Sequence, residues 1–402
     1  MKRIVIVDHF SQTPDEVGNN RFLYLAQLLC ARGYLVEIIT TDFSHKAKKT
    51  RETAPELLEE LPYKYTMLPE PGYPKNVCLQ RFSSHHSFGK QVRKYMAAME
   101  KPNLVYAATP SLDAAGAAAS YCKNNRIPFI VDIQDLWPEA FKLVFNIPVV
   151  SNLIFAPMQA TAKNIYRQAN KIIAVSDSYA KRGLHFCPGK AEALSVYLGT
   201  DLAEFDKKAA ENKPQKAEGQ LWIAYAGTLG HSYNIEIILD ALNLLPDELC
   251  QNLVFKILGD GPLMERFQAK AATCKVQTEF LGRLNYGIMT GYLQNADIAV
   301  NPIVKGAAQS IINKHADYAA AGLPVVSTQE CPEYRNLLET YNCGINCPPE
   351  DAGAVADALE KLLCDPQLRK QMGANSRKMA EDRFDRANTY RQIVDTIERL
   401  MR

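Results

Sequence analysis

The sequence has almost no net charge and no long apolar run at its start. Its 46 basic and 44 acidic side chains leave a formal net charge of +2, which gives no electrostatic case for nucleic-acid binding. Only four apolar residues, Ile4 to Val7, precede Asp8, and four are too few for the core of a signal peptide. We therefore expect the N-terminus to form a first β-strand.

The ten cysteines are scattered, and no zinc-type spacing brings them together. Only Cys343 and Cys347 lie close, without a second pair or neighbouring histidines, so reduced cytosolic thiols are the simplest interpretation. The turn over residues 7–12 also lacks the glycines of a dinucleotide site. We predict an enzyme without a metal or another bound cofactor.

What the sequence does contain is a repeated alternation of short β-branched runs with helical stretches. At 402 residues, the chain is long enough for two or three domains, each with its own core. Alternation of this kind indicates parallel sheets covered by helices on both faces. The strands that we expect are Ile4 to Val7, Leu35 to Thr41, Leu104 to Ala107, Phe129 to Asp132, Ile172 to Val175, Leu221 to Ala226, Val254 to Leu258, Thr278 to Leu281, Ile298 to Val300 and Val325 to Val326.

The fold class is therefore α/β, with two doubly wound, Rossmann-like domains of similar size facing each other over a cleft. We expect the first domain over residues 1–205 and the second over 221–383. Between them, 206–220 is rich in Lys, Glu, Ala and Asn without apolar periodicity, which predicts an exposed linker.

The stretch from Gln309 to Ser327 carries the strongest functional signal. Ser310 is a plausible helix N-cap, and Gly322 suits the left-handed residue that ends a helix. A first turn without carboxylates suits a phosphate, because backbone N–H groups and the helix dipole both favour an anion there. Lys314 and Asp317 lie one turn apart. This pattern predicts a nucleoside-diphosphate clamp, with a solvated Lys–Asp pair as the alternative.

Several motifs give the chain a resemblance to the family-four glycosyltransferases, whose retaining members have the GT-B fold. Residues 132–139, Asp-Ile-Gln-Asp-Leu-Trp-Pro-Glu, are similar to a segment of bacterial members that build capsule, O-antigen and exopolysaccharide. Residues 225–230, 258–262, 280–284 and 198–201 resemble four further landmarks of the family. The resemblance covers nearly the whole chain and implies that a final helix, 384–402, crosses back to the N-terminal domain.

The resemblance also assigns roles to individual residues. The family's two glutamates, with seven residues between them, correspond here to Gln309 and Asp317, and the usual cations after the glycine turn are missing. Lys314 is therefore the main candidate to neutralise the diphosphate, with Asp317 on the ribose diol. The catalytic candidates are Lys314, Gln309 and Asp135. The donor-binding candidates are Gly18, Asn20, Gly227, Thr228, Leu229, Gly259, Arg283, Leu284, Ser310, Ile311, Lys314 and Asp317.

Alternatives remain open at several of these positions. Asp135 can either orient the acceptor hydroxyl or cap a following helix. Asn20 can cap the first helix, and Gly259 can belong to a tight turn without ligand contact. His315 should point to another side of its helix. The uncharged stretch 144–162 and the basic stretch 81–101 are either an interfacial patch, with Phe145, Leu153, Phe155, Arg93 and Lys94 as membrane or acceptor contacts, or a buried helix beside a solvated one.

The expected function is transfer of a sugar from a nucleotide-sugar donor, UDP before GDP, to a polyprenyl-linked saccharide or a growing polysaccharide. This resemblance implies a retaining, metal-independent enzyme in the cytoplasm, peripheral at the inner face of a bacterial cell membrane. The alternatives are a nucleotide-sugar 2-epimerase of the same fold and a catalytically silent nucleotide-sugar-binding subunit, which Gln309 keeps open.

Overall fold

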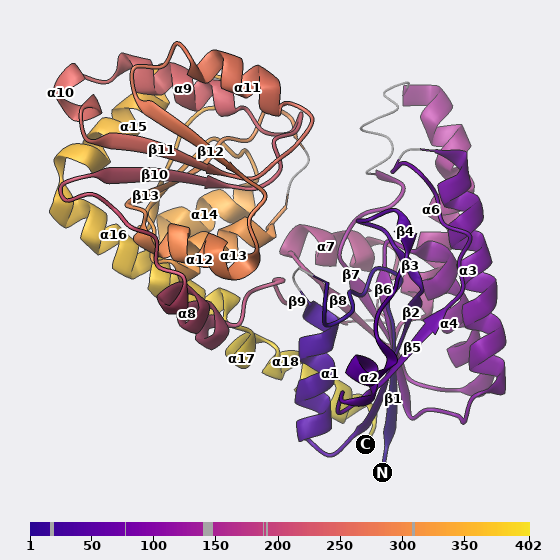
Figure 1. Cartoon of the computed structure of the whole chain (residues 1–402). Helices are drawn as coiled ribbons and strands as arrows, with labels where there is room; N and C mark the ends of the chain where they lie inside the picture. Colours follow the sequence, from indigo (N-terminus) through magenta and orange to yellow (C-terminus); the bar gives the residue numbers. More distant parts are fainter. Residues whose placement is uncertain (17–19, 77, 140–147, 188, 190–191, 308–309) are drawn as a thin grey trace. The chain divides into compact units, whose positions relative to one another are not determined.

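The chain folds into two compact units. The computed structural model describes residues 1–16, 20–76, 78–139, 148–187, 189, 192–307 and 310–402 (Figure 1). Unit 1 combines residues 1–197 with 390–402, and unit 2 comprises 198–389. Unit 1 thus includes residues 390–402 of the segment 384–402 that we expected to cross back to it. Unit 2 begins at residue 198, before the linker that we expected over 206–220.

Unit 1 is built on a seven-stranded sheet in which every neighbouring pair of strands is parallel. The chain adds strands to one side of β1 and then returns to add the remainder on its other side. The switch point of this sheet therefore lies between β1 and β6, where doubly wound folds bind ligands. In spatial order the strands are β5 (Lys64–Leu68), β2 (Leu35–Thr41), β1 (Arg3–Val7), β6 (Leu104–Thr109), β7 (Phe129–Ile133), β8 (Lys171–Ala174) and β9 (Glu192–Ser195).

Helices cover both faces of this sheet, which explains why its central strands are apolar throughout. Along β1, Ile4 and Ile6 pack into the core that contains α1, while Val5 and Val7 pack into the opposite core with α3 and α4. Alternate residues of a strand point to opposite faces, so a strand covered on both sides is apolar at every position. The helices are α1 (Arg21–Ala31), α2 (Pro55–Glu59), α3 (Leu79–Ala98), α4 (Leu112–Asn125), α6 (Pro148–Gln168), α7 (Asp177–His185) and α18 (Arg391–Leu400), and a short hairpin joins β3 (Phe43–Ser44) to β4 (Lys49–Thr50).

The C-terminal helix α18 is part of the core of unit 1. Ile393, Val394 and Ile397 are buried in the same core cluster as the apolar side of α1. Tyr390, just before the helix, lies with its ring 4.9 Å from the buried guanidinium of Arg21. Residues 390–402 are therefore an integral element of the first unit.

Unit 2 repeats the doubly wound plan with six parallel strands. Its switch point lies between β10 and β13. The strand order is β12 (Gln277–Gly282), β11 (Leu253–Leu258), β10 (Leu221–Ala226), β13 (Ile298–Asn301), β14 (Val325–Ser327) and β15 (Gly344–Asn346). The helices are α8 (Leu202–Glu211), α9 (Ile235–Leu244), α10 (Asp247–Cys250), α11 (Met264–Ala271), α12 (Tyr286–Asn295), α13 (Asn313–Ala320), α14 (Pro332–Tyr341), α15 (Ala352–Cys364), α16 (Pro366–Met379) and α17 (Arg386–Thr389), with a π-helical turn over Ala380–Phe384.

The prediction of an exposed linker over 206–220 is wrong for residues 206–211, which belong to a helix. Helix α8 runs through Glu211, and its apolar residues Leu202, Phe205 and Ala209 are buried against unit 2. Asp201 caps this helix by accepting a hydrogen bond from the amide of Glu204 at 3.1 Å. The periodicity starts at residue 202, four residues before the expected linker, so a window beginning at 206 contains only its end.

Candidate nucleotide-binding site in unit 2

Lys314 is a buried cation in the first turn of α13. Its side chain is 7% exposed, and its ammonium group lies 4.2 Å from the ring centre of Tyr225 and 3.9 Å from that of Tyr233. Within the described part of the chain, Nζ has no hydrogen-bond partner and no ion pair. Burial lowers the pKa of Lys314 well below its ordinary value. The solvated Lys–Asp pair is therefore excluded, because Lys314 is buried and makes no ion pair with Asp317 or with another described residue.

The turn after β10 lies directly against this ammonium group. Gly227 has a φ of +148°, and a Cβ built there would lie 2.8 Å from Lys314 Nζ. Glycine suits this position because residues with a side chain rarely adopt that φ, and because a Cβ would displace the Lys314 ammonium group. The turn continues with exposed Thr228 and buried Leu229, and the Thr228 carbonyl accepts a 2.8 Å hydrogen bond from the Tyr225 hydroxyl.

A second turn, after β11, packs on the first. A Cβ at Gly259 would lie 1.7 Å from the Gly227 carbonyl oxygen, and one at Gly261 would lie 2.4 Å from the Leu229 carbonyl oxygen. The two turns are joined by the Leu229 amide, which donates to the Asp260 carbonyl at 3.0 Å. The close packing of the two turns therefore explains a glycine at position 259 without any ligand. Contact between Gly259 and a donor stays a prediction.

Asp317 lies one turn beyond Lys314 but makes different contacts. The Tyr286 hydroxyl, from the start of α12, donates to Asp317 Oδ1 at 3.0 Å and lies 2.9 Å from Thr200 Oγ1. Burial raises the pKa of Asp317 to about 6, against the opposing effect of the Tyr286 hydrogen bond. The carboxylate is therefore held in one orientation and changes charge just below neutral pH.

The start of α13 differs from the prediction. The helix begins at Asn313 with Ile312 at its N-cap, so the N-cap lies two residues after the expected one at Ser310. Within the described residues, Ser310 Oγ is buried without a partner, while the Ser310 carbonyl accepts a hydrogen bond from Gln329 at 3.0 Å. His315 closes the first turn instead, because its Nδ1 accepts from the Ile312 amide at 3.3 Å.

His315 and Ile311 fill the interior beside the site. The His315 ring stacks on Tyr334 with 3.5 Å between ring centres, and burial lowers the pKa of His315 well below its ordinary value. Ile311 is buried. His315 thus points into the protein interior, away from Lys314, as the helical spacing predicts.

The remaining donor-binding predictions fall at less constrained positions. Arg283 is exposed and Leu284 is half-buried, in the turn between β12 and α12. Asn20 precedes α1 in unit 1, and its Oδ1 is buried without a partner among the described residues, so it does not cap that helix through its side chain. Gly18 and Gln309 lie outside the described residues.

Asp135 lies in unit 1, just after β7. Its Oδ1 accepts the Leu136 amide at 2.8 Å. Burial raises the pKa of Asp135, opposed by hydrogen bonds from the Leu136 backbone and the Trp137 side chain and by the charge of Arg81. Residues 136–138 are not helical, so the alternative that Asp135 caps a helix starting at Leu136 is wrong, and orientation of the acceptor stays a prediction.

The membrane prediction is partly corrected. Within α6, Leu153 is 81% exposed and Ile154 is 65% exposed, whereas Phe155 is only 8% exposed and belongs to the core of unit 1. Phe155 therefore cannot be a surface contact, because consecutive helical residues point in different directions. Arg93 and Lys94 are exposed on α3, and Phe145 lies outside the described residues. Among the helices that the structure describes, none is long and apolar enough to cross a bilayer.

Three tyrosines were missed by reasoning from the sequence. Tyr225 and Tyr233 surround Lys314, and Tyr286 orients Asp317. Tyr225 belongs to the glycine-turn motif, and its place at the end of a strand was the only local signal. The contacts of these tyrosines with Lys314 and Asp317 join residues some 30 to 90 positions apart, and no sequence spacing reveals such contacts.

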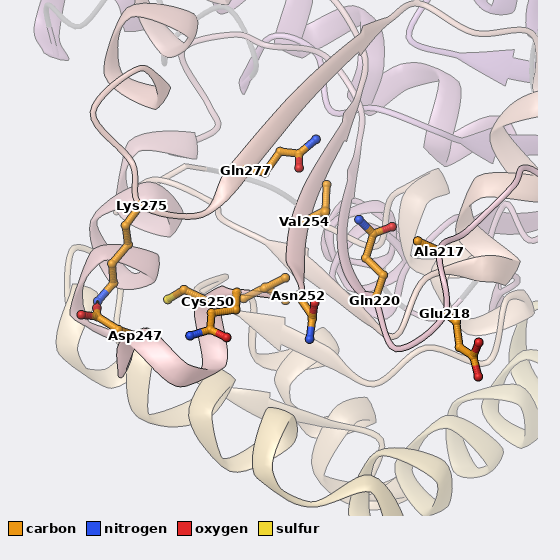
Figure 2. Close-up of a pocket in the computed structure, with 11 residues that line it drawn as sticks. Ala217, Glu218, Gln220, Asp247, Cys250, Asn252, Val254, Lys275 and Gln277 are labelled. Carbon is orange, nitrogen blue, oxygen red and sulfur yellow. The ribbon is translucent and has the colours of Figure 1, made fainter.

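A pocket of about 460 Å³ lies at the opposite edge of the same sheet (Figure 2). Its lining includes Gln220, Asn252 and Gln277, which stand at the amino ends of β10, β11 and β12. Ligands of doubly wound sheets bind at the carboxyl ends of the strands. This pocket is therefore not the predicted donor site.

Comparison with known proteins supports the sequence resemblance. The family described as Glycosyltransferase Family 4 matches residues 18–204, and the family described as Glycosyl transferases group 1 matches residues 206–379. The putative colanic acid biosynthesis glycosyl transferase WcaI of Escherichia coli strain K12 is 24% identical over 228 residues, covering 56% of this chain and 54% of WcaI. The chain spans 54–61% of the length of the first curated relatives that it matches.

Two solved structures resemble the whole chain. Sucrose-phosphate synthase from Thermosynechococcus elongatus has a TM-score of 0.72 at 16% identity, covering 100% of this chain and 99% of the synthase. HepE from Anabaena, solved in complex with UDP, has a TM-score of 0.69 at 16% identity, covering 99% of this chain and 100% of HepE. The two family matches together account for nearly all of the residues, and the fold is that of solved structures over their whole length, so the chain belongs to family four of the glycosyltransferases and has the GT-B fold.

Proposed function

We propose that the protein is a retaining glycosyltransferase that moves a sugar from a nucleotide-sugar donor to a lipid-linked saccharide or a growing surface glycan. UDP is the first choice of nucleotide. The observation that carries the proposal is the buried ammonium of Lys314, which has no anionic partner within the described residues. A buried charge without a partner is costly, and an anionic ligand removes that cost.

The neighbouring turns suit a diphosphate. The backbone at Gly227 lies close to Lys314 Nζ, and it follows the carboxyl end of β10 at the switch point of the sheet. The first turn of α13 has no acidic residue, so its amide groups and helix dipole favour an anion. In this proposal, Asp317 accepts hydrogen bonds from the ribose diol while Lys314 stabilises the leaving diphosphate.

Lys314 would contribute most as the bond to the leaving group breaks. Negative charge on the diphosphate peaks in the transition state, so a fixed cation stabilises that state more than the bound substrate. The two tyrosine rings hold the ammonium group in place before the donor arrives. We propose retention by front-face attack, in which the donor phosphate accepts the proton of the acceptor hydroxyl.

The choice of UDP and of a glycan acceptor rests on relatives. HepE was solved with UDP, and WcaI is named for colanic acid biosynthesis. We assign the acceptor to unit 1, where Asp135 stands at the carboxyl end of β7. Exposed Leu153, Ile154, Arg93 and Lys94 in the same unit suit peripheral contact with an anionic membrane.

A donor panel tests this proposal. The purified chain is incubated with UDP- and GDP-sugars, with and without a polyprenyl-linked saccharide, and nucleotide release is measured. Release that rises with the acceptor, together with an α-linked product from an α-linked donor by NMR, is the expected result. An epimerised sugar nucleotide without transfer would favour the epimerase, and donor binding without any turnover would favour the silent subunit.

A further inference from the structure

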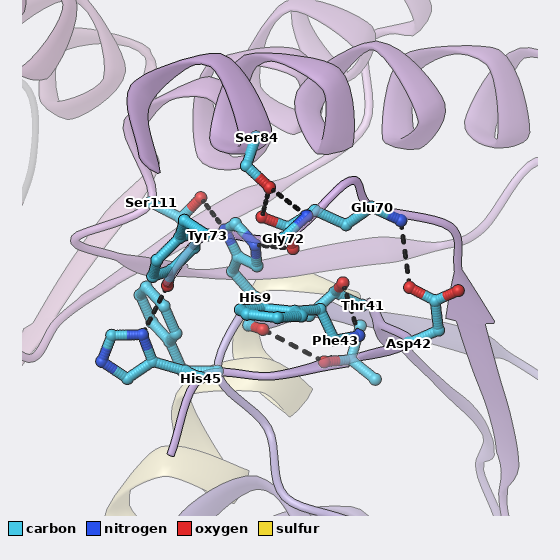
Figure 3. Close-up of polar contacts among 12 residues, drawn as sticks. His9, Thr41, Asp42, Phe43, His45, Glu70, Gly72, Tyr73, Ser84 and Ser111 are labelled. Atoms are coloured by element: carbon cyan, nitrogen blue, oxygen red, sulfur yellow. Dashed lines mark hydrogen bonds and ion pairs between the residues drawn. The ribbon is translucent and has the colours of Figure 1, made fainter. Parts of the chain in front are cut away.

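A second cluster of titratable side chains lies at the switch point of unit 1. His9 follows β1, Glu70 follows β5 and Ser111 follows β6, so three loops meet at the carboxyl edge of the sheet (Figure 3). All three residues are buried. The mechanism proposed for unit 2 uses none of them.

Hydrogen bonds fix the first two of these side chains. His9 Nδ1 lies 2.6 Å from Ser111 Oγ, and His9 Nε2 lies 2.7 Å from Glu70 Oε2 (Figure 3). The other carboxylate oxygen of Glu70 accepts a hydrogen bond from Ser84 Oγ at 2.6 Å. The imidazole and the carboxylate are thus held in place from their far sides by two serine hydroxyls.

His85 on α3 completes the cluster. Its ring centre lies 4.4 Å from that of His9, and its ring stacks on Trp137 at 5.5 Å with an interplanar angle of 6°. His85 is buried, and its Nε2 has no hydrogen-bond partner among the described residues. One potential ligand atom from each of His9, Glu70 and His85 lies within 4.8 Å of the other two.

The side chains of this cluster are of the chemical types that bind metals. Neutral imidazole and carboxylate are the ligand forms for a divalent ion. The charge of Arg81 opposes such an ion, and the Glu70 carboxylate offsets it.

We propose that His9, Glu70 and His85 form a binding site for a divalent transition-metal ion of the zinc type. Two imidazoles and one carboxylate suit zinc, whereas magnesium and calcium prefer oxygen ligands. The ion replaces the hydrogen bond between His9 and Glu70, whose 2.7 Å separation opens to about 3.3 Å, the distance between ligands of a tetrahedral zinc. The His9 proton then resides on Nδ1, where Ser111 Oγ accepts it, as outer hydrogen-bond partners of metal-binding histidines do.

Such an ion would join the loops after β1 and β5 to α3. It also gives a partner to the buried Nε2 of His85, which has none among the described residues. No sequence spacing predicts this site, because its ligands are separated by 61 and 15 positions. The inference rests on unit 1 alone and is independent of the function proposed for Lys314.

Metal content tests the proposal directly. The full chain is stripped with a chelator, dialysed against Zn²⁺ and analysed by atomic emission, and Co²⁺ is added in parallel to record its visible absorption. One ion per chain is expected, with a Co²⁺ spectrum typical of mixed nitrogen and oxygen ligands. His85→Gln should weaken binding by at least tenfold, whereas His86→Gln, which changes the exposed neighbour on α3, should leave it unchanged.

A third variant keeps the test decisive if His85→Gln does not fold. Ser111→Ala removes no ligand, and it should weaken Zn²⁺ binding about tenfold by removing the outer partner of His9. Zn²⁺ binding that is equal in all three variants would place the ion elsewhere and overturn the proposal. The same conclusion would follow if the unaltered chain took up no metal above the dialysis buffer.

Discussion

Replacing Lys314 by methionine should weaken donor binding and stabilise the free protein at the same time. Methionine has a similar length and no charge, so it fills the space between Tyr225 and Tyr233 without a buried cation. The loss of hydrogen bonds to a charged group should cost about 1.5–3 kcal/mol of donor affinity, or roughly 10- to 150-fold in Kd. Turnover should fall further than affinity, because the charge on the leaving phosphate peaks in the transition state.

The gain in stability follows from the same burial. Desolvation of an ion costs several kcal/mol, and a desolvated cation–π contact returns about 2 kcal/mol, so Lys314→Met should raise the free energy of unfolding by about 1–3 kcal/mol at pH 7. The folded-state pKa of Lys314 is lowered below its ordinary value. The loss of stability caused by burying the charged Lys314 is therefore complete below that folded pKa, and it declines as the pH rises towards the unfolded value of 10.5. The difference in unfolding free energy between the Met variant and the parent protein should shrink over the same pH range.

Calorimetry with UDP-glucose and urea unfolding at pH 7 and pH 9.5 measure the two effects. Lys305→Met, at an exposed lysine of the same unit, is the matched control and should change neither quantity. Unchanged donor affinity combined with reduced stability would show that Lys314 is a structural cation of the core. Equal losses in affinity and turnover would reduce its role to binding.

The other predictions concern a carboxylate, a surface and a turn. Because the pKa of Asp317 is raised to about 6, UDP-sugar affinity should rise as the pH increases from 5 to 7, and Asp317→Asn should remove this rise in calorimetric titrations. The raised pKa also means that Asp317 destabilises the fold above pH 6, so the Asn variant should unfold at a higher temperature there and not at pH 4. Replacing exposed Leu153 and Ile154 with serine should reduce co-sedimentation with anionic liposomes without changing donor binding, and a parent protein that does not sediment would contradict the membrane contact. Gly259→Ala should destabilise unit 2 by about 2 kcal/mol or more and abolish donor binding, because its Cβ would meet the Gly227 carbonyl. The control Gly353→Ala, in the open first turn of α15, should instead raise the free energy of unfolding by about 0.4–1 kcal/mol. Urea unfolding measures both changes in stability.

The sequence predicted the strands best where both faces are covered. Strands β2 and β10 have the expected bounds, because uninterrupted apolar and β-branched runs leave few alternatives. Strand β5 was missed, since Lys64–Leu68 alternates at the edge of the sheet, and so was β15, which has only three residues. Helix α8 was missed because the expected linker, 206–220, was chosen by composition and began inside the helix, so it contained only the end of the apolar periodicity.

The candidate site was predicted in its positions but not in its contacts. The residues around Lys314 indicate a helix that favours an anion, and Gly227 and Gly259 stand where two turns approach each other. Burial of Lys314 between two tyrosine rings, and the orientation of Asp317 by Tyr286, depend on long-range packing. Ser310 illustrates the limit of local rules, because capping by His315 replaced the expected serine cap.

The composition of unit 1 from two separate segments has a consequence for synthesis on the ribosome. Residues 198–389 are continuous and contain all of the strands of the second sheet, so the core of unit 2 needs no residue from beyond position 389. Unit 1 is translated first, yet it lacks Ile393, Val394 and Ile397 until the last turns of α18 emerge. The surface of α1 that these residues cover must remain unsatisfied throughout translation of the second unit. Although domains usually mature in the order in which they are made, the later unit of this protein should be the first to reach its native state.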